Sequence, residues 1–174
     1  LKSDQGGEVD LLGKCKHISI HEDLFQNFTS GYARIVDAHN LVMHFPIIGQ
    51  ETITIRYKTP GFNKKTVEMS FDVYSIEGRQ KSDTMKSEVY DIRFISRGYR
   101  VLKQNVVDGA YTGEISKMVG DIFSENMPNE SLSVLKTAGE YKFVMTGNTV
   151  LDTIEWLSAR SVSEESPNNS DYIF

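Results

Sequence analysis

The sequence predicts an α+β protein in which an antiparallel β-barrel or sandwich is followed by a mixed α/β segment. Three observations lead to this fold class. Apolar and polar residues alternate one by one through most of the first hundred residues, the pattern of strands with one buried face. Turn-forming residues separate these runs, and after about Asp108 the apolar residues recur at helical spacing instead.

Five alternating runs predict five strands. Their apolar faces comprise, in chain order, Ile18 and Ile20; Gly31, Ala33 and Ile35; Ile53, Ile55 and Tyr57; Val67, Met69, Phe71 and Val73; and Tyr90, Ile92 and Phe94. The alternation changes phase near Tyr74–Ile76, which predicts a β-bulge or the end of the regular ladder. Pro60-Gly61 and Arg97-Gly98 mark turns, and short strands with turns between them favour a barrel or sandwich.

One connection between these strands has a structure of its own. Asp37–Asn40 followed by Leu41–Phe45 predicts a capped short helix or turn, and Pro46 stops it.

The chain after Asp108 contains two predicted amphipathic helices. Thr112 is placed to cap the first helix, whose apolar residues fall at i, i+3, i+4, i+7 and i+8. These residues are Ile115, Met118, Val119, Ile122 and Phe123. The second helix runs from about Val150 to Arg160, with a capping-box-like start at Thr149 and Asp152.

Strands are also predicted in this part. One lies at Leu132–Leu135, one at Tyr141–Met145, and a last one opens at Asp171–Phe174. Because that last strand has no partner in sight, and because the chain does not start with methionine, we expect the sequence to be a segment of a longer protein that is incomplete at its C-terminus.

Composition restricts the classes of function. The chain has 174 residues, a net charge of −5 and a single cysteine, Cys15. The negative charge argues against a protein whose main task is to grip nucleic-acid phosphates, and no apolar run approaches the roughly 18 residues that span a bilayer. One cysteine cannot form an internal disulfide, which fits a reducing cytosol.

The sequence shows no catalytic apparatus, and no cofactor or metal site is expected. His17 and His21 have the spacing of a helical zinc pair, but they lie in a predicted strand, where four residues span about 13 Å. No nucleophile elbow, phosphate-binding loop or dinucleotide fingerprint occurs. The carboxylate pairs Glu22-Asp23 and Glu164-Glu165 lie in polar surroundings that do not favour acid catalysis.

A set of aromatic residues has two interpretations. A stacking surface for carbohydrate or bases is one, and membership of the core is the favoured other. The set is Phe94, Tyr99, Tyr111, Tyr141 and Trp156.

Three segments of the sequence match the pattern of a known family. The first is FTSGYARIVDAHNLVMHFPIIGQETITIRYKTPG, the second is GAYTGEISKMVGDIF, and the third is TAGEYKFVMTGNTVLDTIEWLSARSV. The matched positions in the first segment are Ile35, Asp37, Asn40, Leu41, Phe45, Pro46, Ile47, Gly49 and Glu51. Together these segments resemble baseplate hub subunits of T-even-like contractile-tailed phages, whose architecture injection-system spike proteins share. In the third segment, Thr149 or Val150 replaces that family's usual proline.

The resemblance implies a tube-type β-barrel over residues 1–107 and the start of a mixed domain over residues 108–174. It implies a structural, non-enzymatic virion protein of the tail baseplate, assembled in the host cytoplasm. Such a hub is a homotrimer that adapts the tail tube protein to the central spike protein, contacts other baseplate proteins, and leaves a lumen through which DNA passes without specific binding. No membrane is involved.

Within this resemblance, residues 37–49 are expected to contact another subunit, because a run of apolar residues in a proline-containing connection would be exposed on a lone barrel. The expected interface residues are Asp37, Asn40, Phe45, Pro46, Ile47 and Ile48. The alternative is that they close the barrel's own end. Two other functions stay open, a stand-alone ligand-binding barrel and a non-catalytic part of a phage tail lysin.

Overall fold

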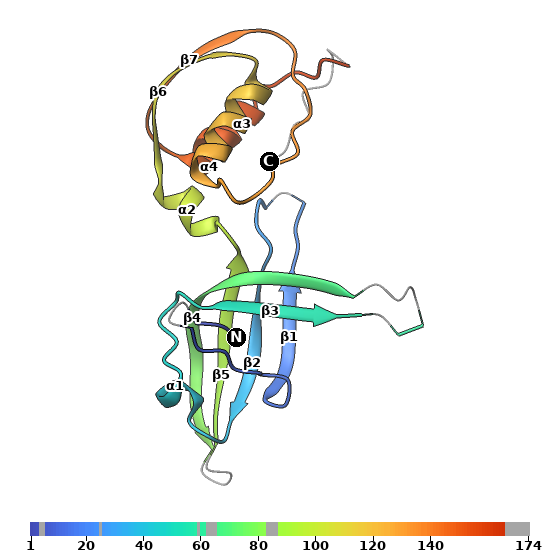
Figure 1. Cartoon of the computed structure of the whole chain (residues 1–174), viewed down its shortest axis with the longest axis vertical. Coiled ribbons are helices and arrows are strands. Elements are labelled where there is room, and N and C mark those ends of the chain that lie inside the picture. The colour runs from blue at the N-terminus through green and yellow to red at the C-terminus, as the bar shows by residue number, and fades with distance from the viewer. Residues whose placement is uncertain (4–5, 25, 59, 62–65, 83–86, 166–174) are drawn as a thin grey trace. The chain divides into compact units, whose positions relative to one another are not determined.

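The computed structural model describes residues 1–3, 6–24, 26–58, 60–61, 66–82 and 87–165, and the chain divides into two units, Leu1–Arg97 and Gly98–Phe174. The elements, in chain order, are β1 (Cys15–His21), β2 (Ser30–Asp37), α1 (Leu41–His44), β3 (Thr52–Tyr57), β4 (Val67–Ser82), β5 (Ser87–Ser96), α2 (Tyr99–Gln104), β6 (Val106–Gly113), α3 (Ile115–Asn126), β7 (Tyr141–Thr149) and α4 (Val150–Ser158) (Figure 1).

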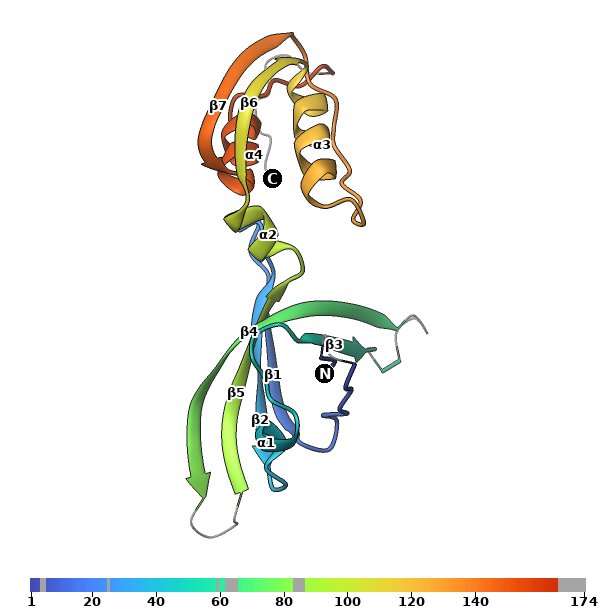
Figure 2. The same ribbon diagram turned by 60° about the vertical axis from the view of Figure 1, so that its left-hand side comes forward.

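The first unit is built on one antiparallel sheet in the order β1-β2-β5-β4-β3. Strand β4 has 16 residues, and its pairing with β5 shifts register between Val73 and Ser75 and again between Glu77 and Gln80. Each extra residue bends the strand and increases its twist. Figure 2 shows the result, in which the first half of β4, together with β3, curls away from the direction of β5. The bulge predicted near Tyr74–Ile76 is confirmed.

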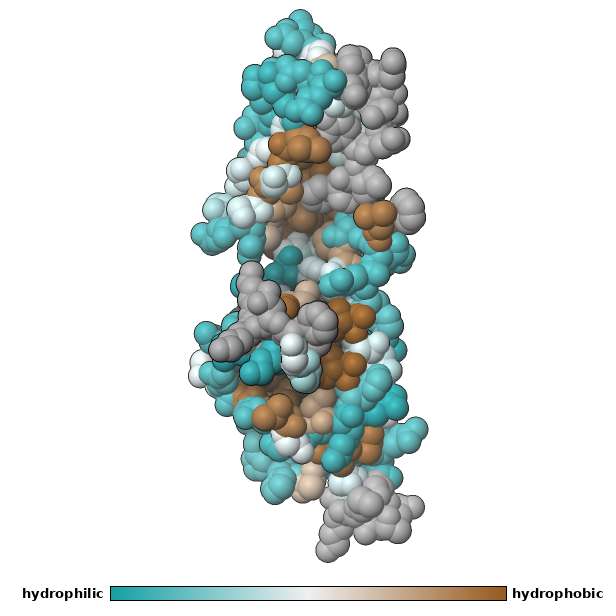
Figure 3. Space-filling model, turned by 90° about the vertical axis from the view of Figure 1, so that its right-hand side faces the viewer, coloured by the Kyte–Doolittle hydropathy of each residue, from teal (hydrophilic) through white to brown (hydrophobic). Residues whose placement is uncertain are grey.

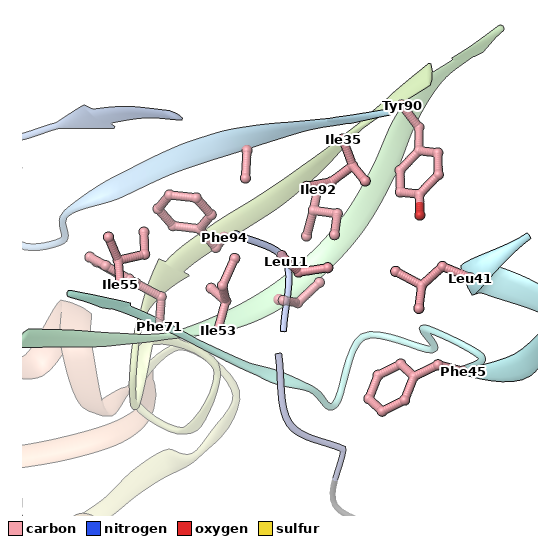
Figure 4. Packing of buried hydrophobic residues seen from close by; sticks show 12 residues of the cluster. Leu11, Ile35, Leu41, Phe45, Ile53, Ile55, Phe71, Tyr90, Ile92 and Phe94 are labelled. Carbon is pink, nitrogen blue, oxygen red and sulfur yellow. The ribbon is translucent and has the colours of Figure 1, made fainter. Parts of the chain in front are cut away.

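The curled sheet is a half-barrel, where the alternation predicted a barrel or sandwich and the resemblance implied a tube-type barrel. Within the described residues, β1 and β3 are the two edges and do not pair with each other. The N-terminal segment reaches one of these edges instead: the backbone N–H of Lys2 donates to the Thr52 oxygen over 2.8 Å, and the Thr52 N–H donates back over 2.9 Å. Leu11, farther along, is buried in the core (Figure 4).

The alternating faces supply the core of this unit. Its buried residues are Leu11, Ala33, Ile35, Leu41, Phe45, Ile53, Ile55, Phe71, Val73, Tyr90, Ile92 and Phe94. Three residues of the predicted apolar faces are more exposed, namely Ile18, Tyr57 and Val67. Ile18 lies on the edge strand β1, and Tyr57 pairs with Val67 at the far end of the β3–β4 ladder. Burial therefore decreases towards the edges of the sheet.

In the second unit, α3 and α4 pack against each other and against the antiparallel pair β6–β7. Both helices were predicted, and their apolar stripes are buried. The cap of α4 is confirmed, since Thr149 Oγ1 accepts from the Asp152 N–H at 3.1 Å. The cap predicted for α3 is wrong: Thr112 lies in β6, and α3 begins after Glu114 with no side-chain cap.

Other elements of this unit differ from expectation. Helix α2 and strand β6 were not predicted, and the expected domain boundary at residues 107/108 falls inside β6. The strand predicted at Leu132–Leu135 is wrong, because this stretch has no strand partner among the residues that the structure describes. Thr137, shortly after it, forms a bridge to Ser163. The strand predicted at Asp171–Phe174 lies outside the described residues.

Gly31 in β2 tests how tightly the half-barrel is packed. A Cβ at Gly31 would overlap the carbonyl oxygen of Ser19 and lie 2.7 Å from the Phe94 ring. We expect Gly31→Ala to lower the free energy of unfolding by about 1–3 kcal/mol through overpacking, measured by urea denaturation. Gly13→Ala is the matched control, because its Cβ would meet no atom within 4 Å. Equal stabilities for the two variants would contradict this account of the packing.

Candidate interface

The connection between β2 and β3, residues 38–50, lies between two buried carboxylates. Asp37 ends β2 and Glu51 directly precedes β3, and each residue is only 1% exposed. A buried carboxylate is costly unless hydrogen-bond donors satisfy it. The donors here come largely from the connection itself.

Asp37 holds the first half of the connection. One of its carboxylate oxygens accepts from the His39 N–H at 3.0 Å, and the other accepts from the Leu41 N–H that opens α1. The Tyr90 hydroxyl donates to Asp37 at 3.4 Å. Burial raises the pKa of Tyr90 well above its usual range, and the negative charge of Asp37 raises it further, so the hydroxyl stays a donor. Asn40 adopts a left-handed conformation (φ 52°) just before the helix.

Glu51 holds the second half in the same way. Its two oxygens accept from the N–H groups of Ile48 and Gly49, each at 2.9 Å, and from Gln50 at 3.2 Å. The Glu51 carbonyl accepts from Val73 N–H at 2.8 Å, at the bulge of β4. The end of the connection is therefore tied to the bend of the half-barrel.

With both ends held, the apolar residues of the connection divide between two directions. Leu41 and Phe45 point into the core, beside Tyr90 and Leu11 (Figure 4), and Ile47 packs partly against it. Met43 and Ile48 point outward, with 81% and 66% of their surfaces exposed.

The six expected interface residues divide accordingly. Asp37 and Phe45 are buried and serve the fold of the unit, as the alternative interpretation supposed, and Ile47 is half-buried. Asn40, Pro46 and Ile48 are exposed and available to a partner.

The six expected interface residues do not include Met43, which lies within residues 37–49, or Tyr74 in β4, which is 53% exposed. Gly49, which follows Ile48, lies next to the backbone of Tyr74, because a Cβ on Gly49 would be 3.7 Å from the Tyr74 carbonyl oxygen. We call Met43, Pro46, Ile48 and Tyr74 the apolar rim. Figure 3 shows that apolar residues also reach the surface elsewhere on the molecule.

The edge strand β3 is a second surface that can receive a partner. Because Thr52 exchanges both backbone hydrogen bonds with Lys2, the backbone groups of Thr54 and Arg56 face the same side of the strand. They have no further backbone partner among the residues that the structure describes. An unpaired edge is a template for strand addition.

The outer face of the sheet carries charges in pairs. Arg34 binds Asp91 through two hydrogen bonds of 2.8 and 2.9 Å, and Arg93 binds Glu77 at 2.9 Å. Each pair crosses from one strand to its neighbour. The hydrogen bonds from Arg34 lower the pKa of Asp91 below its usual value. This face is consequently close to electrically balanced.

The candidate metal residues do not gather into a site. His17 and His21 lie on either side of Tyr32, their ring centroids 5.5 and 6.4 Å from the tyrosine ring. No group of three or more histidine, cysteine or acidic residues in the described ranges is placed to hold a metal ion. Partial burial raises the pKa of the Cys15 thiol, the opposite of an activated nucleophile. Glu164 is engaged by Lys136 at 2.7 Å.

The aromatic set does not form one surface. Phe94 is in the core of the first unit, as favoured, whereas Tyr99, Tyr111, Tyr141 and Trp156 are half-buried in the second. No helix in the described part of the chain is long and apolar enough to cross a membrane.

Comparison with known proteins identifies a shared fold. The tail protein from Neisseria meningitidis MC58 aligns with a TM-score of 0.51 over 81% of this chain and 39% of that chain, at 12% sequence identity. The present chain is thus similar to less than half of that protein. No protein-family model and no curated protein matches the sequence. At this sequence identity, the likeness shows the fold alone.

The hydrogen bonds of Glu51 predict a local effect of its substitution. In Glu51→Gln, one oxygen that accepts backbone N–H groups becomes an NH₂ donor. We expect the free energy of unfolding to fall by about 1–3 kcal/mol and the amide hydrogens of Ile48 and Gly49 to exchange faster. Glu68→Gln is the control, because Glu68 pairs with Arg56 on the exposed surface and its loss should change stability little. Unchanged exchange at Ile48 and Gly49 would refute the role given to Glu51.

Proposed function

We propose that this chain is a structural subunit of a viral tail, with a mechanical and not a catalytic role. The observation that carries the proposal is the fold shared with a tail protein over 81% of the chain. The buried polar residues are consistent with it, because Asp37 and Glu51 use their carboxylates to hold the backbone of the connection and the phenol of Tyr90.

The finer proposal is a place in the baseplate hub. Its support is the resemblance of the three sequence segments, and two of the matched residues, Asp37 and Glu51, are the ones that fix the β2–β3 connection. In this role a homotrimer joins the tail tube protein to the central spike protein and contacts other baseplate proteins. DNA passes through its lumen without specific binding. The protein resides in the virion tail and is assembled in the host cytoplasm.

Two surfaces of the first unit suit such an assembly. The β3 edge offers the backbone groups of Thr54 and Arg56 to an incoming strand, which would continue the ladder that Lys2 begins. The apolar rim offers side chains that are exposed on an isolated subunit. Met43, Pro46 and Ile48 lie in the connection that Asp37 and Glu51 hold, so that docking them costs little conformational entropy.

The rim predicts a specific assembly defect. We expect Met43→Asp combined with Ile48→Asp to fold normally, because both side chains are exposed, but to stop the full-length protein from forming rings or trimers. Light scattering and negative-stain electron microscopy, alone and with the tail tube protein, provide the measurement. Leu12→Asp combined with Leu135→Asp is the control, since these residues are 87% and 74% exposed at other places. Assembly that survives the rim variant but fails in the control would exclude the rim as an interface.

The edge strand predicts a second, separable defect. Thr54→Pro removes one outward N–H from β3 and should leave the fold intact, because proline is tolerated on edge strands. We expect it to weaken assembly by at least about tenfold, corresponding to the loss of one backbone hydrogen bond and its geometry. Thr54→Val keeps the N–H and should assemble normally. A proline variant that is folded and assembles like the wild type would show that β3 receives no strand. A protein that stays monomeric with every tail partner would favour a stand-alone binding module.

A further inference from the structure

An arginine stacked on the chain's single tryptophan forms an exposed feature of the second unit. The guanidinium carbon of Arg160 lies 3.8 Å from the centroid of the Trp156 ring, and its Nη1 donates to the Trp156 carbonyl oxygen at 3.0 Å. Trp156 is half-buried and Arg160 is exposed. The guanidinium is therefore fixed in position while its charge faces solvent.

Two further aromatic rings lie next to the tryptophan. Phe143 of β7 meets Trp156 edge-on at 5.0 Å, and Tyr141 is stacked parallel to Phe143 at 5.7 Å. Gly139 allows this arrangement, because a Cβ there would come within 3.1 Å of the Tyr141 ring. We call Tyr141, Phe143, Trp156 and Arg160 the aromatic platform. Tryptophan, tyrosine and arginine are the residues that most often dominate the energetics of protein interfaces.

The platform arginine has no carboxylate partner within the residues that the structure describes. Other cations of this unit have carboxylate partners: Lys103 binds Asp152 at 2.9 Å, and Lys117 binds Glu114 at 3.1 Å. Arg160 is thus a preorganised cation, on an apolar base, whose charge is not neutralised by its own chain. A carboxylate is the complementary group.

Helix α3 of the same unit presents such carboxylates. Asp121 and Glu125 are exposed and four residues apart, so they form one stripe along α3. Neither forms an ion pair in the part of the chain that is described. The surrounding unit is strongly acidic, since residues 98–174 contain 11 aspartates and glutamates against 6 lysines and arginines.

We propose that the aromatic platform of one copy binds the Asp121/Glu125 stripe of a second copy of this chain. Charge complementarity between two features of the same unit supports this occupant. Because the platform and the stripe are different surfaces, the contact is head-to-tail and repeats from copy to copy. It involves neither the apolar rim nor the β3 edge, so it is independent of the proposed function and can fail separately from it.

Charge reversal tests the contact in the full-length chain. The measurement is the association constant from sedimentation at low ionic strength, followed in parallel by the emission of Trp156, which no other tryptophan obscures. Arg160→Glu, and Asp121→Lys combined with Glu125→Lys, should each weaken association at least about tenfold. Carrying all three substitutions in one chain should restore it, because the charges are complementary again. Added salt should weaken the wild-type contact.

Lys142→Glu is the matched control. It causes the same change in net charge at an exposed position of β7, next to Phe143 in sequence but alternating to the other face of the strand. It should leave association and Trp156 emission unchanged. Arg160→Gln removes the charge without reversing it and should cause a smaller loss of association. It replaces Arg160→Glu as the test variant if the thermal midpoint shows that the reversed charge disturbs folding.

Several outcomes would overturn the proposal. These are a wild-type protein that is monomeric at all concentrations, a Lys142→Glu variant as defective as Arg160→Glu, or a triple variant that does not recover. Association that is insensitive to both charge reversals but lost in Thr54→Pro would assign self-assembly to the first unit alone, which would leave the proposed function standing.

Discussion

Two carboxylates that are almost completely buried determine the shape of the first unit, because each must find donors and each finds them in the same connection. Asp37 fixes the start of α1, and Glu51 fixes the turn before β3. With both ends held, Leu41 and Phe45 can only complete the core, and Met43 and Ile48 can only face outward. The exposed apolar side chains are thus a consequence of the buried polar ones.

The same anchoring couples the connection to the curvature of the sheet. The Glu51 carbonyl accepts from Val73, the residue at which the β4–β5 register shifts, so the turn and the bend are held by one hydrogen bond. The bend curls the sheet around its core without bringing β1 and β3 together. A half-barrel has edges that a closed barrel lacks, and those edges are where a partner strand can continue the ladder.

Period-two alternation predicted all five strands of this sheet and the β4 bulge, because each strand has one face on the core. Periodicity did not predict the elements whose apolar residues are not regularly spaced. Helix α2 has six residues and a single buried one, Leu102, and β6 includes two glycines, so neither gives a clear period. Glu51 was recognised only as a matched position, and Asp37 was expected at a capped turn and in an interface. That both are buried depends on donors brought close by the fold, which spacing along the chain does not reveal.

The net charge of −5 is not evenly distributed along the chain. Residues 1–97 contain 13 basic and 13 acidic residues, so the excess of acid belongs to residues 98–174. On the outer face of the first unit, Arg34 and Arg93 are already paired with carboxylates across the strands. A partner that used those charges would have to break existing pairs, and the gain would largely cancel. The backbone edge and the apolar rim carry no such cost, which is why the contacts of the first unit are best sought there and not on its charged face.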